Sequence, residues 1–208
     1  MIPIKTSKNL SISNKNQYID KIFQSIIDTN HNSDDLILVI SIEQNDISFR
    51  EFSNFLTTID HIYGRFYRKG FMSYAMSQNE HLTASEIRFG SLEIIIEDIL
   101  KKLSVHNAIY FYLMIKYLPA AISQGTEIVK NLTESFKNYE DGRFIRIQRK
   151  SLSKELRKDA LLKNLTDDEI KKLTRNLTAK YAKDKKGLKK AAKFAAQKLL
   201  DVQLRKRK

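Results

Sequence analysis

The chain has no cysteine and no tryptophan, and only six glycines and two prolines occur among its 208 residues. The absence of cysteine excludes a disulfide scaffold, a zinc site with thiolate ligands and a cysteine nucleophile. The glycines never fall in the spacing of a P-loop or a dinucleotide-binding turn, and no Gly-x-Ser-x-Gly elbow is present. The sequence therefore lacks the motifs of several large enzyme classes.

Histidine is also scarce, and the four residues His31, His61, His81 and His106 are widely separated. None has a second histidine or a carboxylate at a spacing that suits a metal site in a cleft. The pairing of an arginine and a histidine a few residues apart, which marks small helical toxin nucleases, is missing too. We therefore expect no metal, no cofactor and no catalytic residues, and hence a protein that is not an enzyme.

The first ten residues contain lysines but no apolar run of the kind that a secretion signal needs. Together with the absence of cysteine, this predicts a cytoplasmic protein.

Charge is distributed very unevenly along the chain. Residues 1–142 hold 14 Lys and Arg against 17 Asp and Glu, whereas residues 143–208 hold 23 against 7. We interpret this as a mildly acidic body over 1–142 and a basic tail over 143–208. Such asymmetry favours an acidic partner: nucleic acid, an anionic membrane or an acidic protein surface.

The first half of the chain alternates between helical and strand patterns. Apolar residues at helical spacing predict helices over about 17–28 and 48–69, and Ser48 with Glu51 forms a capping box for the second. The β-branched run LILVISI at 36–42 predicts a buried central strand, and alternation over 71–77 predicts another.

The stretch 84–96 fits two structures. A strand with a bulge at Gly90-Ser91 would place the apolar residues before and after the bulge on the same face of the sheet, and we favour this interpretation. A helix beginning at Ser91 is the alternative, because the apolar residues from Leu92 onward also recur at helical spacing.

The region 105–122 is the most apolar part of the chain. Its length approaches that of a membrane span. His106, Asn107, Lys116 and Pro119 interrupt it, so a buried core helix is favoured, with Pro119 in the first turn of a following helix. A membrane-acting effector that uses this helix remains an alternative.

Beyond it, apolar residues at helical spacing continue to a turn expected at Asp141-Gly142. The basic region then predicts three helices, over about 151–163, from Thr166 to about 181, and over 187–204. Thr166 and Glu169 have the spacing of a capping box.

Two groups of charged residues are candidate sites. Glu93, Glu97 and Asp98 cluster at an apolar segment and precede two lysines, which leaves a metal-dependent nuclease as a further alternative, although exposed charges at the start of a helix explain them equally well. The second group forms a dense positive face for phosphates or another acidic partner. Its members are Lys185, Lys186, Lys189, Lys190, Lys193, Lys198, Arg205, Lys206, Arg207 and Lys208.

The stretch LILVISIEQNDISFREFSNFLTTIDHIYGRFY and the later SEIRFGSLEIIIEDI give a strand, a capped helix and a strand with a Gly-Ser step. With the apolar helices that follow, residues 36–142 resemble small α+β modules of bacterial conflict and anti-phage systems, described as TRADD-N-like adaptor domains. The resemblance implies a ferredoxin-like sheet and an adaptor or self-associating role, and it implies no catalytic residues. It does not extend over the basic region.

These patterns together predict an α+β fold: a small sheet with covering helices, followed by an all-helical basic region. Few strands and a rich apolar helical half predict a homo-oligomer. The expected function is that of a non-enzymatic binding or adaptor protein, active in antiviral defence, which binds nucleic acid without sequence preference or binds an acidic protein.

Overall fold

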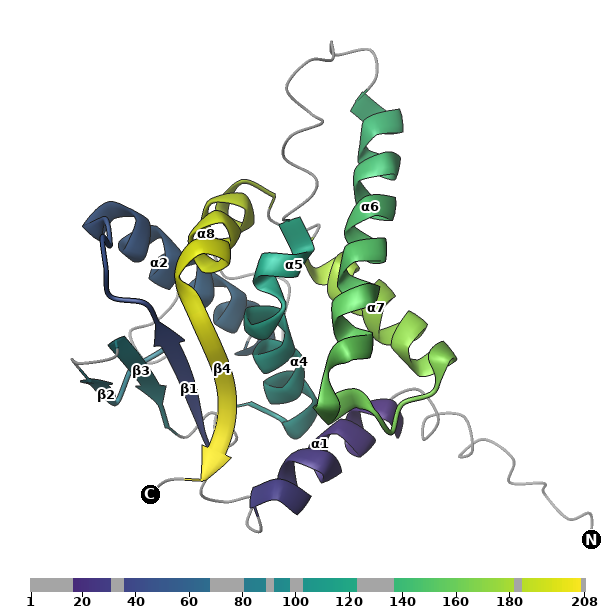
Figure 1. The fold of residues 1–208 in the computed structure, drawn as a ribbon, viewed down its shortest axis with the longest axis horizontal. Helices are drawn as coiled ribbons and strands as arrows, with labels where there is room; N and C mark the ends of the chain where they lie inside the picture. The colour runs from purple at the N-terminus through teal and green to yellow at the C-terminus, as the bar shows by residue number, and fades with distance from the viewer. Residues whose placement is uncertain are drawn as a thin grey trace, which may run out of the picture.

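The computed structural model describes residues 17–30, 36–67, 81–88, 92–97, 103–122, 137–181 and 185–206. These residues form helices and a small antiparallel sheet, so the predicted α+β class is confirmed (Figure 1). The strand expected over 71–77 lies outside the described residues.

Within the described residues the sheet has four strands in the order β2-β3-β1-β4, and each is antiparallel to its neighbours. Their bounds are β1 (Leu36–Ile42), β2 (Glu86–Arg88), β3 (Leu92–Ile96) and β4 (Leu199–Lys206). The predicted central strand is confirmed, because β1 lies between β3 and β4.

Strand β1 is buried on both faces, which explains its unbroken apolar sequence. One face of β1 points into the main core and carries Leu36, Leu38, Ile40 and Ile42. Ile37 and Val39 point to the other face, where they form a small cluster with Ile95 of β3.

The stretch 84–96 contains two strands rather than one bulged strand. β2 pairs with β3 in antiparallel register, with Glu86 opposite Ile95 and Arg88 opposite Glu93. The chain therefore reverses direction between Arg88 and Leu92, and the phase change that suggested a bulge reflects a hairpin connection. The alternative helix from Ser91 is also wrong, since Leu92–Ile96 is a strand.

Helices pack around this sheet, and those of the first half agree with the sequence pattern. Their bounds are α1 (Gln17–Asn30), α2 (Phe49–Tyr67), α4 (Val105–Lys116) and α5 (Leu118–Ile122). Helix α4 is a core helix, because all side chains from Ala108 to Ile115 are buried. Pro119 lies in the first turn of α5, where a missing backbone N–H costs nothing.

The basic region begins with a long helix, α6 (Lys137–Lys158), that was only partly anticipated. It starts before the predicted 151–163 and runs through Asp141 and Gly142, so the turn expected there is wrong. The 3₁₀ helix η5 (Ala160–Leu162) follows it.

Helix α7 (Asp167–Tyr181) begins at the predicted capping box. The Glu169 carboxylate accepts from the Thr166 amide at 2.8 Å, and the Glu169 amide donates to the Thr166 hydroxyl at 3.3 Å. These reciprocal bonds satisfy two amides that the helix itself leaves unpaired.

The last elements correct the largest error of the sequence interpretation. Helix α8 ends at Lys198, and Leu199–Lys206 is strand β4, not the end of a helix over 187–204. The basic region is therefore not all-helical. Because Val202 and Leu204 belong to the same core cluster as Leu38 and Ile40, the change of charge at residue 142 is not a boundary of the hydrophobic core.

Candidate nucleic-acid interface

Helix α8 (Lys185–Lys198) presents part of the predicted phosphate-binding set from a well-anchored position. Its buried side consists mainly of small alanines, with Leu188 and Phe194 as the large members. The Phe194 ring lies 4.9 Å from that of Phe55 on α2, centroid to centroid, and α8 also packs against α5. These contacts fix the direction in which the exposed side of the helix points.

Lys190 and Lys193 occupy that exposed side. Within the described residues neither forms an ion pair. Two other members of the predicted set are used inside the molecule. Lys198 donates to the backbone carbonyl of Asn45, and Arg205 pairs with Glu93 at 3.4 Å.

The side chains of Lys185, Lys186, Lys189 and Lys206 lie outside the described part of the structure, as do Arg207 and Lys208 entirely. The structure thus shows two exposed cations of the ten and commits two to internal contacts.

A second positive surface, which the sequence interpretation missed, lies on α6. Arg146, Lys150, Lys154 and Arg157 are exposed and follow one another at steps of four, four and three residues. We name these four residues the α6 basic stripe. Helical spacing of this kind places side chains on one face, so the signal was present in the sequence but hidden within the general basic excess.

The four residues of the stripe differ in whether they form ion pairs. Arg157 pairs with Asp167 at the start of α7, with 2.5 Å between nitrogen and oxygen. Arg146, Lys150 and Lys154 form no ion pair with any residue that the structure describes. Helix α6 itself packs against α5 and α7 through its C-terminal half, while its N-terminal half extends beyond α5 (Figure 1).

Of the three acidic candidates, the structure describes Glu93 and Glu97. Glu93 points to the sheet face away from the main core and pairs with Arg205, and Glu97 follows directly after β3. Asp98 lies outside the described residues. Among the residues that the structure describes, no group of three His, Asp or Glu side chains could hold a metal ion.

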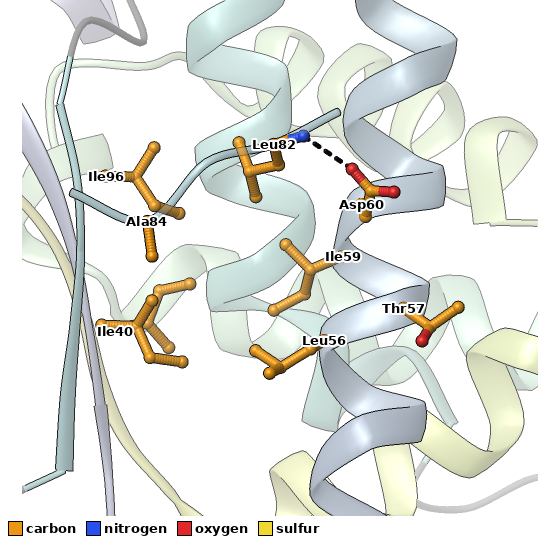
Figure 2. A pocket seen from close by; sticks show the side chains of 9 residues that line it. Ile40, Leu56, Thr57, Ile59, Asp60, Leu82, Ala84 and Ile96 are labelled. Carbon is orange, nitrogen blue, oxygen red and sulfur yellow. Dashed lines mark hydrogen bonds between the residues drawn. The ribbon is translucent and has the colours of Figure 1, made fainter. Parts of the chain in front are cut away.

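A cavity of about 280 Å³ lies between the sheet and α2 (Figure 2). Its described lining is mainly apolar and includes two polar side chains, Thr57 and Asp60. The Thr57 hydroxyl donates to the Ser53 carbonyl at 2.8 Å. The Asp60 carboxylate accepts from the Leu82 amide at 2.7 Å, and its other oxygen lies 2.7 Å from Nδ1 of His81. Both described polar side chains of the lining are therefore hydrogen-bonded within the protein.

The end of α4 is joined to the end of α6 by a partly buried polar contact. Lys116 lies 2.6 Å from a carboxylate oxygen of Asp159, and the Tyr117 hydroxyl donates to the same oxygen. The other oxygen accepts from the Leu161 amide at 2.9 Å. The described partners of Asp159 lie at or just beyond the ends of α4 and α6, so we interpret this contact as one that stabilises the fold.

The pKa of Asp159 reflects this environment. Burial raises the pKa of the carboxyl, but the hydrogen bonds from Lys116 and Tyr117 outweigh burial, and the net pKa is lowered. The carboxylate is therefore charged in the folded protein at neutral pH.

A second buried polar contact holds α1 against α4 and α7. The hydroxyls of Tyr18 and Tyr110 are hydrogen-bonded to each other, and the Asn176 amide donates to them at 2.6 and 3.0 Å. Burial raises the pKa of Tyr110, so its hydroxyl stays protonated.

In the described residues, no helix has the length and apolar character needed to cross a membrane. No family model matches the chain, and neither a curated protein nor a solved structure matches it. The interface must therefore be interpreted from its own charges and geometry.

Proposed function

We propose that the protein is a non-enzymatic binding or adaptor protein whose basic region, residues 143–208, contacts the phosphate backbone of nucleic acid. The observation that carries the proposal is the excess of 23 Lys and Arg over 7 Asp and Glu in this region. The exposure of Lys190 and Lys193 on a firmly packed helix supports it. Backbone binding requires only such a positive surface and no particular base-reading residues.

The order of the strands supports a ferredoxin-like core. Antiparallel neighbours in the order β2-β3-β1-β4, with α2 between β1 and β2 and helices between β3 and β4, follow the split β-α-β arrangement of ferredoxin-like sheets. We therefore propose a ferredoxin-like core, and with it a TRADD-N-like role in antiviral defence in the bacterial cytoplasm, with self-association through the body. Because a fold hosts many functions, the binding experiment below addresses the nucleic-acid part of the proposal.

The experiment should use the full chain. Strand β4 and the buried side of α8 belong to the main core, so deleting residues 143–208 would remove part of the fold as well as the charges. Fluorescence anisotropy with labelled duplex DNA and RNA, titrated at several salt concentrations, measures binding without truncation.

If about five cations contact phosphates, the logarithm of the affinity should fall with the logarithm of salt concentration with a slope of roughly −4 to −5. Binding of random duplexes with similar affinity is expected. No binding to DNA or RNA at low salt would overturn the proposal and leave an acidic protein surface as the partner. Shortened strands on a denaturing gel after incubation with Mg²⁺ would overturn its non-enzymatic part.

A further inference from the structure

The α6 basic stripe has a regular geometry. With 1.5 Å of rise per residue, the step from Arg146 to Lys150 spans about 6 Å and the whole stripe about 16 Å. At about 100° per residue, its four members fall within roughly a quarter of the helix circumference. The buried residues Leu152 and Leu156 occupy the opposite side. Packing therefore turns the stripe outward.

The three leading cations of the stripe are not neutralised by described residues, unlike several other basic side chains. Lys171 pairs with Asp168 on α7, Lys21 pairs with Glu169, and Lys116 is used internally. Arg146, Lys150 and Lys154 instead stand in a row with no described carboxylate in contact. Unneutralised like charges in a row repel one another, and a polyanion would relieve that repulsion.

The surroundings of the stripe favour nucleic acid over a membrane or a protein. A helix that lies on a membrane needs an exposed apolar face, but Leu152 and Leu156 of α6 are already buried in the protein. A protein interface usually has an apolar or aromatic centre with charges at its rim, and the stripe itself contains only cations. A row of cations matches the regular negative charge of a phosphodiester backbone.

We infer that α6, through Arg146, Lys150 and Lys154, is the main phosphate-binding element of the protein, and that its partner is the phosphate backbone of nucleic acid. The inference rests on the proposed function and moves its centre from α8, where the sequence interpretation placed it, to α6. Arg157 stays with Asp167 and orients the last turn of α6 toward α7.

The test replaces Arg146, Lys150 and Lys154 together by Gln, which preserves helix propensity while removing three charges. The matched control replaces three exposed cations elsewhere, Lys163, Lys171 and Lys172, by Gln and changes the net charge equally. A second comparison variant carries Lys190→Gln and Lys193→Gln. Duplex binding is measured by anisotropy over a range of salt concentrations, and circular dichroism verifies folding.

The stripe variant should bind on the order of 100-fold more weakly near 0.1 M salt, and its salt slope should flatten by about two to three units. The control should change the slope by less than about one unit. If the wild type binds but the stripe variant keeps the wild-type slope, or the control loses as much, the inference is wrong and the proposed function survives. If the wild type itself does not bind, the proposed function has failed.

A second measurement does not depend on how well the triple variant folds. Because the chain has no cysteine, Lys154→Cys creates a unique attachment site for a photo-crosslinker, and Lys172→Cys provides the control. Irradiation with duplex DNA should attach the strand at position 154 and much less at 172. Equal crosslinking at both positions would contradict a localised site on α6.

Discussion

Helices α4 and α6 differ in how much of their surface is buried. In α4 every side chain from Ala108 to Ile115 is buried, so no face is left for a partner. In α6 the buried residues lie on one side, around Leu152 and Leu156, and cations occupy the other. The difference shows that α4 belongs to the core along this stretch, whereas the exposed side of α6 carries positive charge. Substitutions in the two helices should therefore have separable effects.

The largest effect is expected in α4. The Phe111 ring is fully buried and meets the rings of Tyr63 and Phe66 edge-on, with centroids 5.8 and 6.3 Å away. Phe111→Ala should lower the free energy of unfolding by about 3–5 kcal/mol, because it removes buried surface and leaves a cavity. Urea denaturation measures the loss. A decrease below about 1 kcal/mol would show that α4 does not form the core.

A smaller effect is expected at Asp159, where the two helices meet. Asp159→Asn removes the charge that Lys116 faces and should lower the free energy of unfolding by about 1–3 kcal/mol at neutral pH. The charge stabilises the fold above the unfolded-state pKa of about 3.9, because the folded-state pKa is lower.

The same contact gives a pH dependence. As the pH falls through the folded-state pKa of Asp159, the carboxylate is protonated and its contribution is lost. The stability difference between wild type and Asp159→Asn should therefore be full at pH 7 and shrink below about pH 4 in urea titrations. A difference that stays constant down to pH 3 would mean that the charge of Asp159 contributes nothing.

The smallest effect on stability is expected on the α6 basic stripe. Lys150→Ala changes an exposed side chain with no described ion pair, so the free energy of unfolding should move by less than about 0.5 kcal/mol. Alanine is also a good helix former. A loss above about 1.5 kcal/mol would show that the stripe has a structural role and would remove the contrast with α4.

Local patterns in the sequence predicted the elements whose formation depends on local chemistry. The β-branched run of β1, the apolar spacing of α2 and the capping box at Thr166 and Glu169 all report on interactions within a few residues. Each of these elements is present in the structure.

The errors occur where distant pairing or packing decides the structure. Leu199 and Val202 continue the helical spacing of α8, but pairing with β1, far away in the sequence, turns them into a strand. The alternation of Val202 and Leu204 with polar residues was a signal for that strand. Gly142 would ordinarily favour a turn, yet α6 continues through it.

The candidate site was only partly predictable for a related reason. The basic excess was visible in the composition, but composition does not say which cations pair internally. Lys198 and Arg205 belong to the predicted phosphate-binding set, and the structure shows in addition that they contact Asn45 and Glu93. Their partners come from β3 and from the segment after β1, which no local pattern connects to them.

The pairing of β1 with β4 also affects how the chain reaches its fold. In the sequence, nearly all described residues lie between these two strands. Closing so long a loop costs much conformational entropy, so we expect β1 and β4 to pair late in folding. Until β4 pairs, one edge of the LILVISI strand has unpaired backbone groups. The segment contains no charged residue and no proline, which would discourage pairing with the same segment of another molecule. During refolding at high concentration, pairing of β1 with β4 in one molecule therefore competes with aggregation between molecules. Once it has paired, β4 covers the edge of β1 at which another molecule could add.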